Sequence, residues 1–509
     1  MYKFKSKQIS FSDFGQPVGM EMNPDNRWIN KAAAIPWAEI EMRYANLFVN
    51  RKGNVAKPLR LALGSLIIQM EYGFSDEETA LMIQENPYLQ FFCGFAKYEY
   101  KLPFDPSLMV HFRKRLTPAI VGEINELIIK KAITEKSKKE DDSSQGPGIS
   151  TQDDNDGEDN ADEDDSSQTP EITSENEADE NIQIPEPFTD NEGTLIVDAT
   201  CAPSDIKYPQ DIELLNRARE NTEEMITQLH DPKDGRKPRT YKKQARKDYL
   251  TMVRKKRKTA REIRKGIRKQ LQYLERNLRS IDILLGKGKT LIPKWQKRLG
   301  IILSLFEQQK YMFDNHTHSV ESRIVSLSQP HLRPIVRGKI KAPVEFGAKL
   351  DISVCDGFVR LEKQSFEAYN EATTLKAVIE RFKERTGKYP DRILADKIYR
   401  NRDNLAYCKE RGIRLSGPAL GRPKKNEKPD RKQDYKDICE RVEVERKFSF
   451  AKLNCGLGRI YTRLAETTES VIALSFLVVN LKKICRDLAT LFLRILLAEI
   501  HHEKLAFIQ

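Results

Sequence analysis

The chain lacks the cysteine and histidine patterns of disulfide-bonded or zinc-binding proteins. Its seven cysteines are scattered over 509 residues, and none of them forms a C-x-x-C pair. An odd number of scattered cysteines is typical of reduced thiols in a cytosol. His316 and His318 lie two positions apart and His501 and His502 are adjacent, but neither pair has the partners that a zinc site needs.

The chain also lacks a long apolar run and an apolar leader. The longest apolar stretch, "VIALSFLVV" at 471–479, is about half as long as a transmembrane helix requires. The opening residues "MYKFKSKQISFSDF" have no hydrophobic segment of the kind found in signal peptides. We therefore expect a cytoplasmic protein without a membrane partner.

Basic residues are missing altogether from one segment, residues 140–190, which holds 19 acidic residues. Since the formal net charge of the chain is +12, removing these 19 negative charges leaves +31 on the remainder. The strong positive charge outside this segment favours a polyanionic partner, and nucleic acid is the leading class of partner. An unspecific, highly charged soluble surface is the alternative.

The amino-terminal part is predicted to be helical. Residues 59–72 have apolar side chains at helical spacing and end at Gly73, and Ser75 with Glu78 forms a capping box for the next helix. A short helix within "NPYLQFFCGF" at 86–95 and two helices divided near Pro118 follow, the first of these two capped by Asp105. We predict a helical domain at 1–136 that binds DNA, with Arg113 and Arg115 among the contacts. A plain helical bundle with a basic edge is the alternative.

A linker and a second domain are expected beyond this point. Residues 137–192 are rich in Asp, Glu, Ser and Asn and poor in large apolar side chains, which predicts a disordered acidic linker. It can serve as a spacer or compete with DNA for basic surfaces. Residues 193–500 would form the second domain, interrupted by a basic helical insertion at about 205–320.

The insertion is strongly basic. Residues 233–269 hold 18 Lys and Arg against three acids. A long solvated helical hairpin would explain the helical pattern, but unbalanced positive charge of this density repels itself. A phosphate backbone as partner is therefore favoured.

Three acidic residues stand out in the second domain. Asp198 ends the strand-like run "TLIVDA", Asp396 ends the strand "DRILAD", and Glu445 lies in a later helix. Strands are also predicted within 322–363, with a hairpin turn at Asp356-Gly357. Three carboxylates gathered at one place are suitable ligands for Mg²⁺. Two such ions can activate an attacking oxygen and stabilise a leaving oxygen in phosphodiester chemistry.

Other positions support this arrangement. Arg441, Glu445 and Lys452 are spaced by four and seven residues, so they share one helix face. Glu443 would point to another face, while Asp351, Asp356 and Asp391 are interpreted as structural. Taken alone, the three helix residues could be an ordinary surface row of ion pairs.

The chain resembles insertion-sequence DDE transposases with an InsH-type helical amino-terminal domain and a ribonuclease-H-like core. The strings "LRLALGSLIIQMEYGFSDEET", "FRKRL", "LIVDATCAPSDIKYPQD", "QPHLRPIVRGK", "EFGAKLDIS", "ILADKIYRNRDN" and "RVEVERKFSFAKLNCGLGRI" carry the resemblance. The family pattern Tyr-x2-Arg-x3-Glu-x6-Lys is matched by Arg441, Glu445 and Lys452. Ile438 replaces the tyrosine.

The resemblance implies an α/β and α+β multidomain fold in which a mixed-sheet core follows the helical domain. It implies that Asp198, Asp396 and Glu445 are catalytic and bind two Mg²⁺ ions, for which Mn²⁺ can substitute. Arg441, Lys452 and Arg446 would contact DNA. The partners would be the double-stranded terminal inverted repeats and target DNA, bound by a homodimer associated with the bacterial nucleoid.

The implied activity is metal-dependent cleavage at the ends of an insertion sequence, followed by strand transfer. Asp198 would bridge both ions, and Asp396 and Glu445 would each support one. Two alternatives stay open at this level. One is a ribonuclease-H-like nuclease that does not join DNA, and the other is a catalytically inactive DNA-binding protein derived from a transposase.

Overall fold

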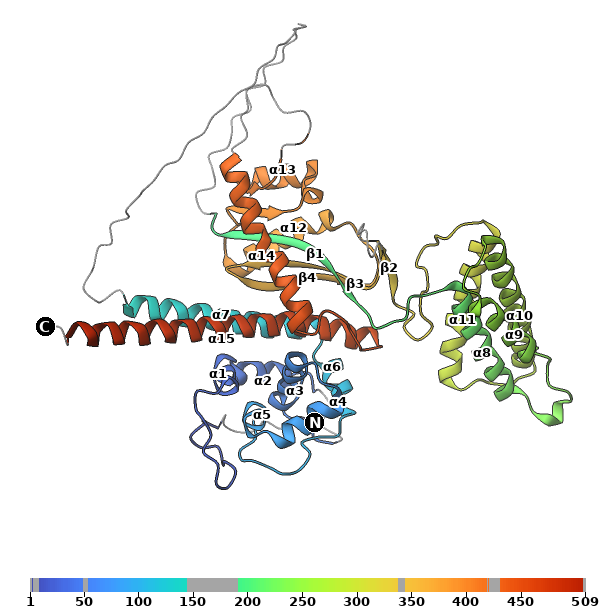
Figure 1. Cartoon of the computed structure of the whole chain (residues 1–509), viewed down its shortest axis with the longest axis horizontal. Coiled ribbons are helices and arrows are strands. Elements are labelled where there is room, and N and C mark those ends of the chain that lie inside the picture. Colours follow the sequence, from blue (N-terminus) through green and yellow to red (C-terminus); the bar gives the residue numbers. More distant parts are fainter. Residues whose placement is uncertain are drawn as a thin grey trace, which may run out of the picture.

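The structure is a computed structural model that describes residues 2, 9–48, 54–143, 191–336, 344–418, 420 and 431–506. Its amino-terminal part is a compact set of helices below the sheet in Figure 1. These are α1 (Arg27–Ala34), α2 (Trp37–Ala45), α3 (Leu59–Tyr72), α4 (Asp76–Glu85), α5 (Pro87–Phe92) and α6 (Leu108–Arg115). The predicted linker lies mostly outside the described residues.

Local sequence signals explain most of these helix boundaries. Helix α3 is apolar and buried around almost its whole circumference, and it ends at Gly73 in the left-handed conformation with φ of 73°. Ser75 and Glu78 form the predicted capping box at the start of α4. The prediction for α6 was wrong by two residues, because Asp105 and Ser107 hydrogen-bond to each other in a preceding turn.

Two amino-terminal helices, α1 and α2, were not anticipated from the sequence. Both helices are short, but α2 buries Trp37, Ile40 and Tyr44 along one face, and Trp28 and Trp37 both lie edge-on against Phe92 of α5. Large aromatic side chains bury enough surface to hold such short helices in place.

A six-stranded mixed sheet forms the second layer of the molecule. The path β2-β3-β1-β5-β6 runs through it, and β4 pairs with β3 off this path. The bounds are β1 (Thr194–Pro203), β2 (Arg333–Val336), β3 (Val344–Cys355), β4 (Phe358–Ser365), β5 (Arg392–Ala395) and β6 (Arg414–Leu415). Strand β3 is antiparallel to β1, whereas β5 is parallel to β1 and β6 is parallel to β5. This order is ribonuclease-H-like and confirms the predicted mixed-sheet core.

The two faces of the sheet pack on different helices. Ile196, Ile352 and Leu394 join the core that contains α14 (Arg431–Asn454) and α15 (Ala465–Ala506). Leu195, Val197 and Ile393 face α12 (Leu375–Thr386) and α13 (Arg402–Glu410). Because side chains alternate along a strand, even-numbered residues of β1 lie on the α14 side.

The predicted strand pattern in 322–363 was right in part. Strands β3 and β4 are joined at Asp356 and Gly357, which have φ of 52° and 73°; two positive φ values match the twist of a tight hairpin. The run at 322–328 forms no strand. Its apolar residues Ile324, Val325 and Leu327 are instead buried, and Ile324 and Leu327 join the core of the insertion.

The insertion is a helical module with a hydrophobic core of its own. It comprises α8 (Asp211–Leu229), α9 (Lys242–Arg254), α10 (Ala260–Gly286) and α11 (Pro293–Asp314). Leu215, Leu274 and Leu305 are fully buried in its core, which is separate from the cores on the sheet. Figure 1 shows the module beyond the far end of β1, away from α14.

Two long helices connect the amino-terminal helices with the sheet. Helices α7 (Pro118–Ser143) and α15 run side by side between them (Figure 1). Helix α7 thus extends seven residues into the stretch predicted as linker. Asn480 of α15 hydrogen-bonds to Asn125 of α7 and to both backbone groups of Val359 in β4.

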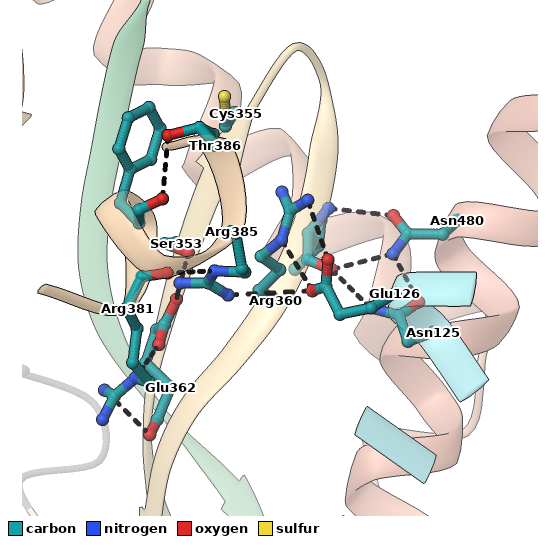
Figure 2. A network of polar contacts seen from close by, with 12 residues as sticks. Asn125, Glu126, Ser353, Cys355, Arg360, Glu362, Arg381, Arg385, Thr386 and Asn480 are labelled. Carbon is teal, nitrogen blue, oxygen red and sulfur yellow. Dashed lines mark hydrogen bonds and ion pairs between the residues drawn. The ribbon is translucent and has the colours of Figure 1, made fainter. Parts of the chain in front are cut away.

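A charged network extends this connection to α12. Figure 2 shows Glu126 of α7 facing Arg360 of β4, which donates two hydrogen bonds to it. Glu362, whose side chain is only 1% exposed, accepts hydrogen bonds from Ser353, Arg381 and Arg385. A buried carboxylate is stable only if hydrogen bonds and ion pairs offset the loss of its hydration. The network therefore holds α7 and α12 to the same strand.

Candidate active site

Asp198 lies in the middle of β1, not at its end as predicted. Strand β1 continues to Pro203 because β3 pairs with it over its whole second half, as far as Gly347. The side chain of Asp198 is partly buried on the α14 side of the sheet. Its Oδ1 accepts a hydrogen bond from the backbone N–H of Ala199 at 2.8 Å.

Asp396 follows β5 directly and is exposed. Val197 of β1 is the register partner of Ala395 in β5, and the two strands are parallel. The next residue along each strand is an aspartate, so the register brings Asp198 and Asp396 next to each other. Asp396 accepts a hydrogen bond from the backbone N–H of Lys397 at 2.7 Å, which begins a short 3₁₀ turn.

Burial raises the pKa of Asp198 to about 6. The negative charges of Asp396 and Glu371 raise this pKa further, while the hydrogen bond from Ala199 and the positive charge of Arg441 lower it. A carboxylate that is partly buried beside a second carboxylate is destabilised by desolvation and repulsion. A cation bound between Asp198 and Asp396 would relieve both effects.

Helix α14 crosses this face of the sheet and carries the remaining residues of the predicted site. Lys452 donates a hydrogen bond to the Thr200 hydroxyl of β1 at 3.0 Å. Arg441 is close enough to Asp198 to act on its pKa. Glu445 lies between these two cations, with its Oε1 3.7 Å from the Arg441 guanidinium and its side chain 57% exposed.

The three predicted metal ligands are not gathered around one point. No group of three or more His, Cys, Asp or Glu side chains with the spacing of a metal site occurs within the described part of the chain. Asp198 and Asp396 are adjacent, whereas Glu445 turns toward Arg441 and solvent. Oxygen ligands on two strands and a neighbouring helix suit Mg²⁺ in kind, but the glutamate has to move toward the aspartates to join them.

Helix α14 separates this site from a groove on its other flank. Val444, Phe448 and Ala451 are buried beneath the helix. At 100° per residue, Arg441, Glu445 and Lys452 fall on one side of that buried stripe, and Glu443 and Arg446 fall on the other. Glu443 and Arg446 line a groove of about 770 Å³ between α14 and α15, and Glu443 is paired with Lys447.

Arg113, which was predicted to contact DNA, is buried among its neighbours. Arg113 is 6% exposed, forms an ion pair with Asp76 and donates a hydrogen bond to Gln69 at 2.7 Å. It therefore holds α6 against α3 and α4. Arg115 is half-buried over the ring of Phe48.

Two further acids, Asp351 and Glu371, lie near the site, and the sequence indicated a role for only the first of them. Asp351 was interpreted as structural, and it is fully buried on the far face of the sheet with a hydrogen bond from Tyr369 at 2.7 Å. Glu371 was not singled out. It forms an ion pair with Lys349 at 3.0 Å and acts on the pKa of Asp198. No sequence pattern indicated this proximity.

Among the helices of the described residues, none is both long and apolar enough to cross a bilayer.

Comparison with known proteins matches two separate parts of the chain to transposase families. The family "Transposase DDE domain" matches residues 393–482, which contain Asp396, Arg441, Glu445 and Lys452. The family "Transposase domain (DUF772)" matches residues 19–115, which comprise helices α1 to α6. Asp198 and the insertion lie outside both matches.

One curated relative is the "Uncharacterized protein ORF8 in nfe locus" of Rhizobium meliloti. It is 33% identical over 112 residues, which make up 22% of this chain and 54% of the relative. The chain therefore spans about half the length of the relative that it matches. No solved structure matches the chain.

The sheet order and the adjacent strand aspartates are consistent with a ribonuclease-H-like core. Two separate parts of the chain are similar to transposase domains, and the second of them, 393–482, is similar to the DDE domain.

Proposed function

We propose that the chain is a DNA transposase that cleaves phosphodiester bonds at the ends of an insertion sequence and transfers the freed strands into target DNA. The observation that carries this proposal is the β1–β5 register, which sets Asp198 beside Asp396 on the face crossed by α14. The family match to 393–482 supports the assignment of Asp396 and Glu445.

Asp198, Asp396 and Glu445 would hold Mg²⁺, for which Mn²⁺ can substitute. The bound ions would supply charge neutralisation at the phosphodiester and activation of the attacking oxygen. The chain's own residues would do the rest. Arg441 and Lys452, on either side of Glu445 along the same helix flank, would bind phosphate oxygens and orient the strand for in-line attack.

The position of Glu445 is consistent with a role that depends on DNA. Its carboxylate is exposed and its closest cation, Arg441, lies 3.7 Å away, so it is not locked in place. When Arg441 binds a phosphate, its attraction for Glu445 weakens. The glutamate then becomes free to join the two aspartates.

The partners would be double-stranded terminal inverted repeats and target DNA, and a homodimer would pair the two ends of the element. Binding to chromosomal DNA would place the protein at the nucleoid. These partners follow from the proposed reaction, which needs two ends and one target.

The test is cleavage and joining of a labelled duplex that carries the ends of the element, with Mg²⁺. Wild type, Glu445→Ala and the matched control Glu443→Ala would be compared, because the two glutamates lie two positions apart on opposite flanks of α14. We expect loss of both steps only in Glu445→Ala, with DNA binding retained. Cleavage without joining by wild type would indicate a nuclease, and equal activity of all three proteins would refute the site.

A further inference from the structure

We propose that the tip of the helical insertion, formed by α9, the 255–259 connection and the first turns of α10, binds the backbone of duplex DNA at a distance from the active site. The proposal builds on the proposed function, because it takes DNA as the substrate. It adds a second contact surface that neither family match covers.

The charge of this tip is unbalanced. Residues 242–269 contain 14 Lys and Arg and two acids, so this stretch alone carries a net +12, which equals the formal net charge of the whole chain. Both acids are already engaged. Asp248 is paired with Lys269 and accepts a hydrogen bond from Tyr273, and Glu262 is paired with Lys255 and caps α10.

Most of the cations have no structural use in the described part of the chain. The exceptions are Lys255 and Lys269, which pair with the two acids, and Arg264, which lies 4.0 Å over the ring of Phe313. Arg261, Lys265 and Arg268 are exposed, and their side chains contact no acid or hydrogen-bond acceptor among the described residues. Spaced by four and three residues, they form one stripe along α10.

The stripe is also placed where it does not stabilise its own helix. Arg261 and Lys265 lie in the first two turns of α10, which begins at Ala260. The amino-terminal end of a helix carries a partial positive charge, so cations there are disfavoured. Like charges at four-residue spacing add repulsion. A bound polyanion would offset both effects.

The shape of the tip favours duplex DNA over a small anion. Helix α9 buries only Ala245, and the first buried residue of α10 is Gln270, so both helices present most of their cations to solvent. A row of separate exposed cations along a helix matches the repeated charges of a nucleic-acid backbone.

Because the module has its own core and lies beyond the far end of β1 (Figure 1), DNA on this tip would be DNA outside the reacting phosphodiester. The contact would add affinity for long duplexes without changing the chemistry. Its signature would be ionic, since each phosphate contact releases counterions on binding.

The test uses the full chain in EDTA, so that neither metal nor cleavage enters the measurement. Fluorescence anisotropy would give the affinity for a random-sequence duplex over a range of salt concentrations. The triple variant R261Q/K265Q/R268Q would be compared with K287Q/K294Q/K297Q, which removes three exposed lysines from other parts of the same module.

We expect the first variant to lose affinity by at least about tenfold at low salt, and its salt slope to fall by about 2–3. The control should behave as wild type, and R261K/R268K should keep the slope because it keeps the charges. Equal slopes for the two triple variants would overturn the proposal. Loss of binding to poly-L-glutamate with duplex binding unchanged would overturn it in favour of an acidic polypeptide.

Failure of this inference and failure of the proposed function give different results. If wild type cleaves and joins DNA while the triple variant binds normally, only the tip assignment is wrong. If the triple variant loses DNA affinity while wild type never cleaves, the tip binds DNA and the catalytic proposal is wrong.

Discussion

Lys452 donates a hydrogen bond to the hydroxyl of Thr200 at 3.0 Å, and this bond ties α14 to the strand that carries Asp198. The two residues are 252 positions apart in the chain. The contact joins α14 to β1 two residues beyond Asp198, on the same flank of the helix as the turn that lies beside the aspartates. That turn carries Arg441 and Glu445.

Two substitutions can distinguish the proposed role of Lys452 in binding phosphate from its hydrogen bond to Thr200. Thr200→Val removes the hydroxyl and keeps the lysine, whereas Lys452→Ala removes both the hydrogen bond and the charge. We expect Lys452→Ala to lower the rate of cleavage by about 10²-fold, because a phosphate-positioning charge is lost, and Thr200→Val to lower it far less. Single-turnover cleavage rates check this. Equal losses would mean that Lys452 serves only to position α14.

Asp198→Asn should stabilise the metal-free protein while abolishing cleavage. Burial raises the pKa of Asp198 to about 6 from an ordinary value of 3.8. The folded state therefore holds this proton more tightly than the unfolded state. Ionisation costs stability progressively as the pH rises from 3.8 to about 6, reaching at most about 3 kcal/mol above that range.

Thermal unfolding in EDTA would measure this effect at two pH values. The advantage of Asp198→Asn over wild type should be present at pH 7.5 and should shrink to less than about 1 kcal/mol near pH 4, where the aspartate is protonated in the folded state and only partly ionised in the unfolded state. Mg²⁺ should raise the melting temperature of wild type and have little effect on the variant. A variant that is less stable than wild type at pH 7.5 would contradict the prediction.

Arg113→Ala should destabilise the amino-terminal helices and should not act through DNA. The guanidinium is buried and paired with Asp76 and Gln69, which would be left without their partner. We expect a loss of about 3 kcal/mol in the free energy of unfolding, measured by urea denaturation. The neighbour Lys114, which is exposed, supplies the control Lys114→Ala. Unchanged stability with weakened DNA binding would restore the direct contact.

Glu362→Gln should loosen the connection between α7, β4 and α12. Burial alone would raise the pKa of Glu362, but the charge of Arg385, the hydrogen bond from Ser353 and the charge of Arg381 together hold this pKa below its ordinary value of 4.5. Its contribution to stability is therefore present above pH 4.5 and is lost as the pH falls through the lower, folded-state pKa.

The substitution removes a charge that faces two arginines, and we expect a loss of about 3 kcal/mol at neutral pH. Glu384→Gln, at an exposed position on the same helix α12 as both arginines, is the matched control. Urea denaturation at pH 7 and at pH 4 would measure both. A loss that is as large at pH 4 as at pH 7 would show that the carboxylate charge is not its source.

Sequence patterns predicted those features that depend on neighbouring residues. Gly73 ends α3 in the left-handed conformation, Ser75 and Glu78 cap α4, and Asp356 and Gly357 form a hairpin turn. Each of these depends on backbone preferences over a few residues. The prediction of a strand at 322–328 was wrong, because a short apolar pattern does not distinguish a strand from a buried irregular segment.

Contacts between distant residues escaped this kind of prediction. Nothing local indicates that Arg113 is buried, because its neighbours His111 and Lys114 are exposed and its partner Asp76 is 37 positions away. Glu371 is near Asp198 only because the η2 turn (Glu371–Thr374) folds back beside Lys349 of β3. The pairing of α7 with α15 joins opposite ends of the chain.

The sequence by itself determined helix α3 and its end at Gly73, the capping box of α4, the hairpin turn at Asp356-Gly357 and the acidic residues available for catalysis. These follow from side-chain chemistry at short range. Only the tertiary structure decided that β1 runs on to Pro203, that its register with β5 places Asp198 beside Asp396, and that α14 directs Glu445 and Glu443 to opposite flanks. The reason is that strand register and helix placement are fixed by the packing of whole faces, which no single segment contains.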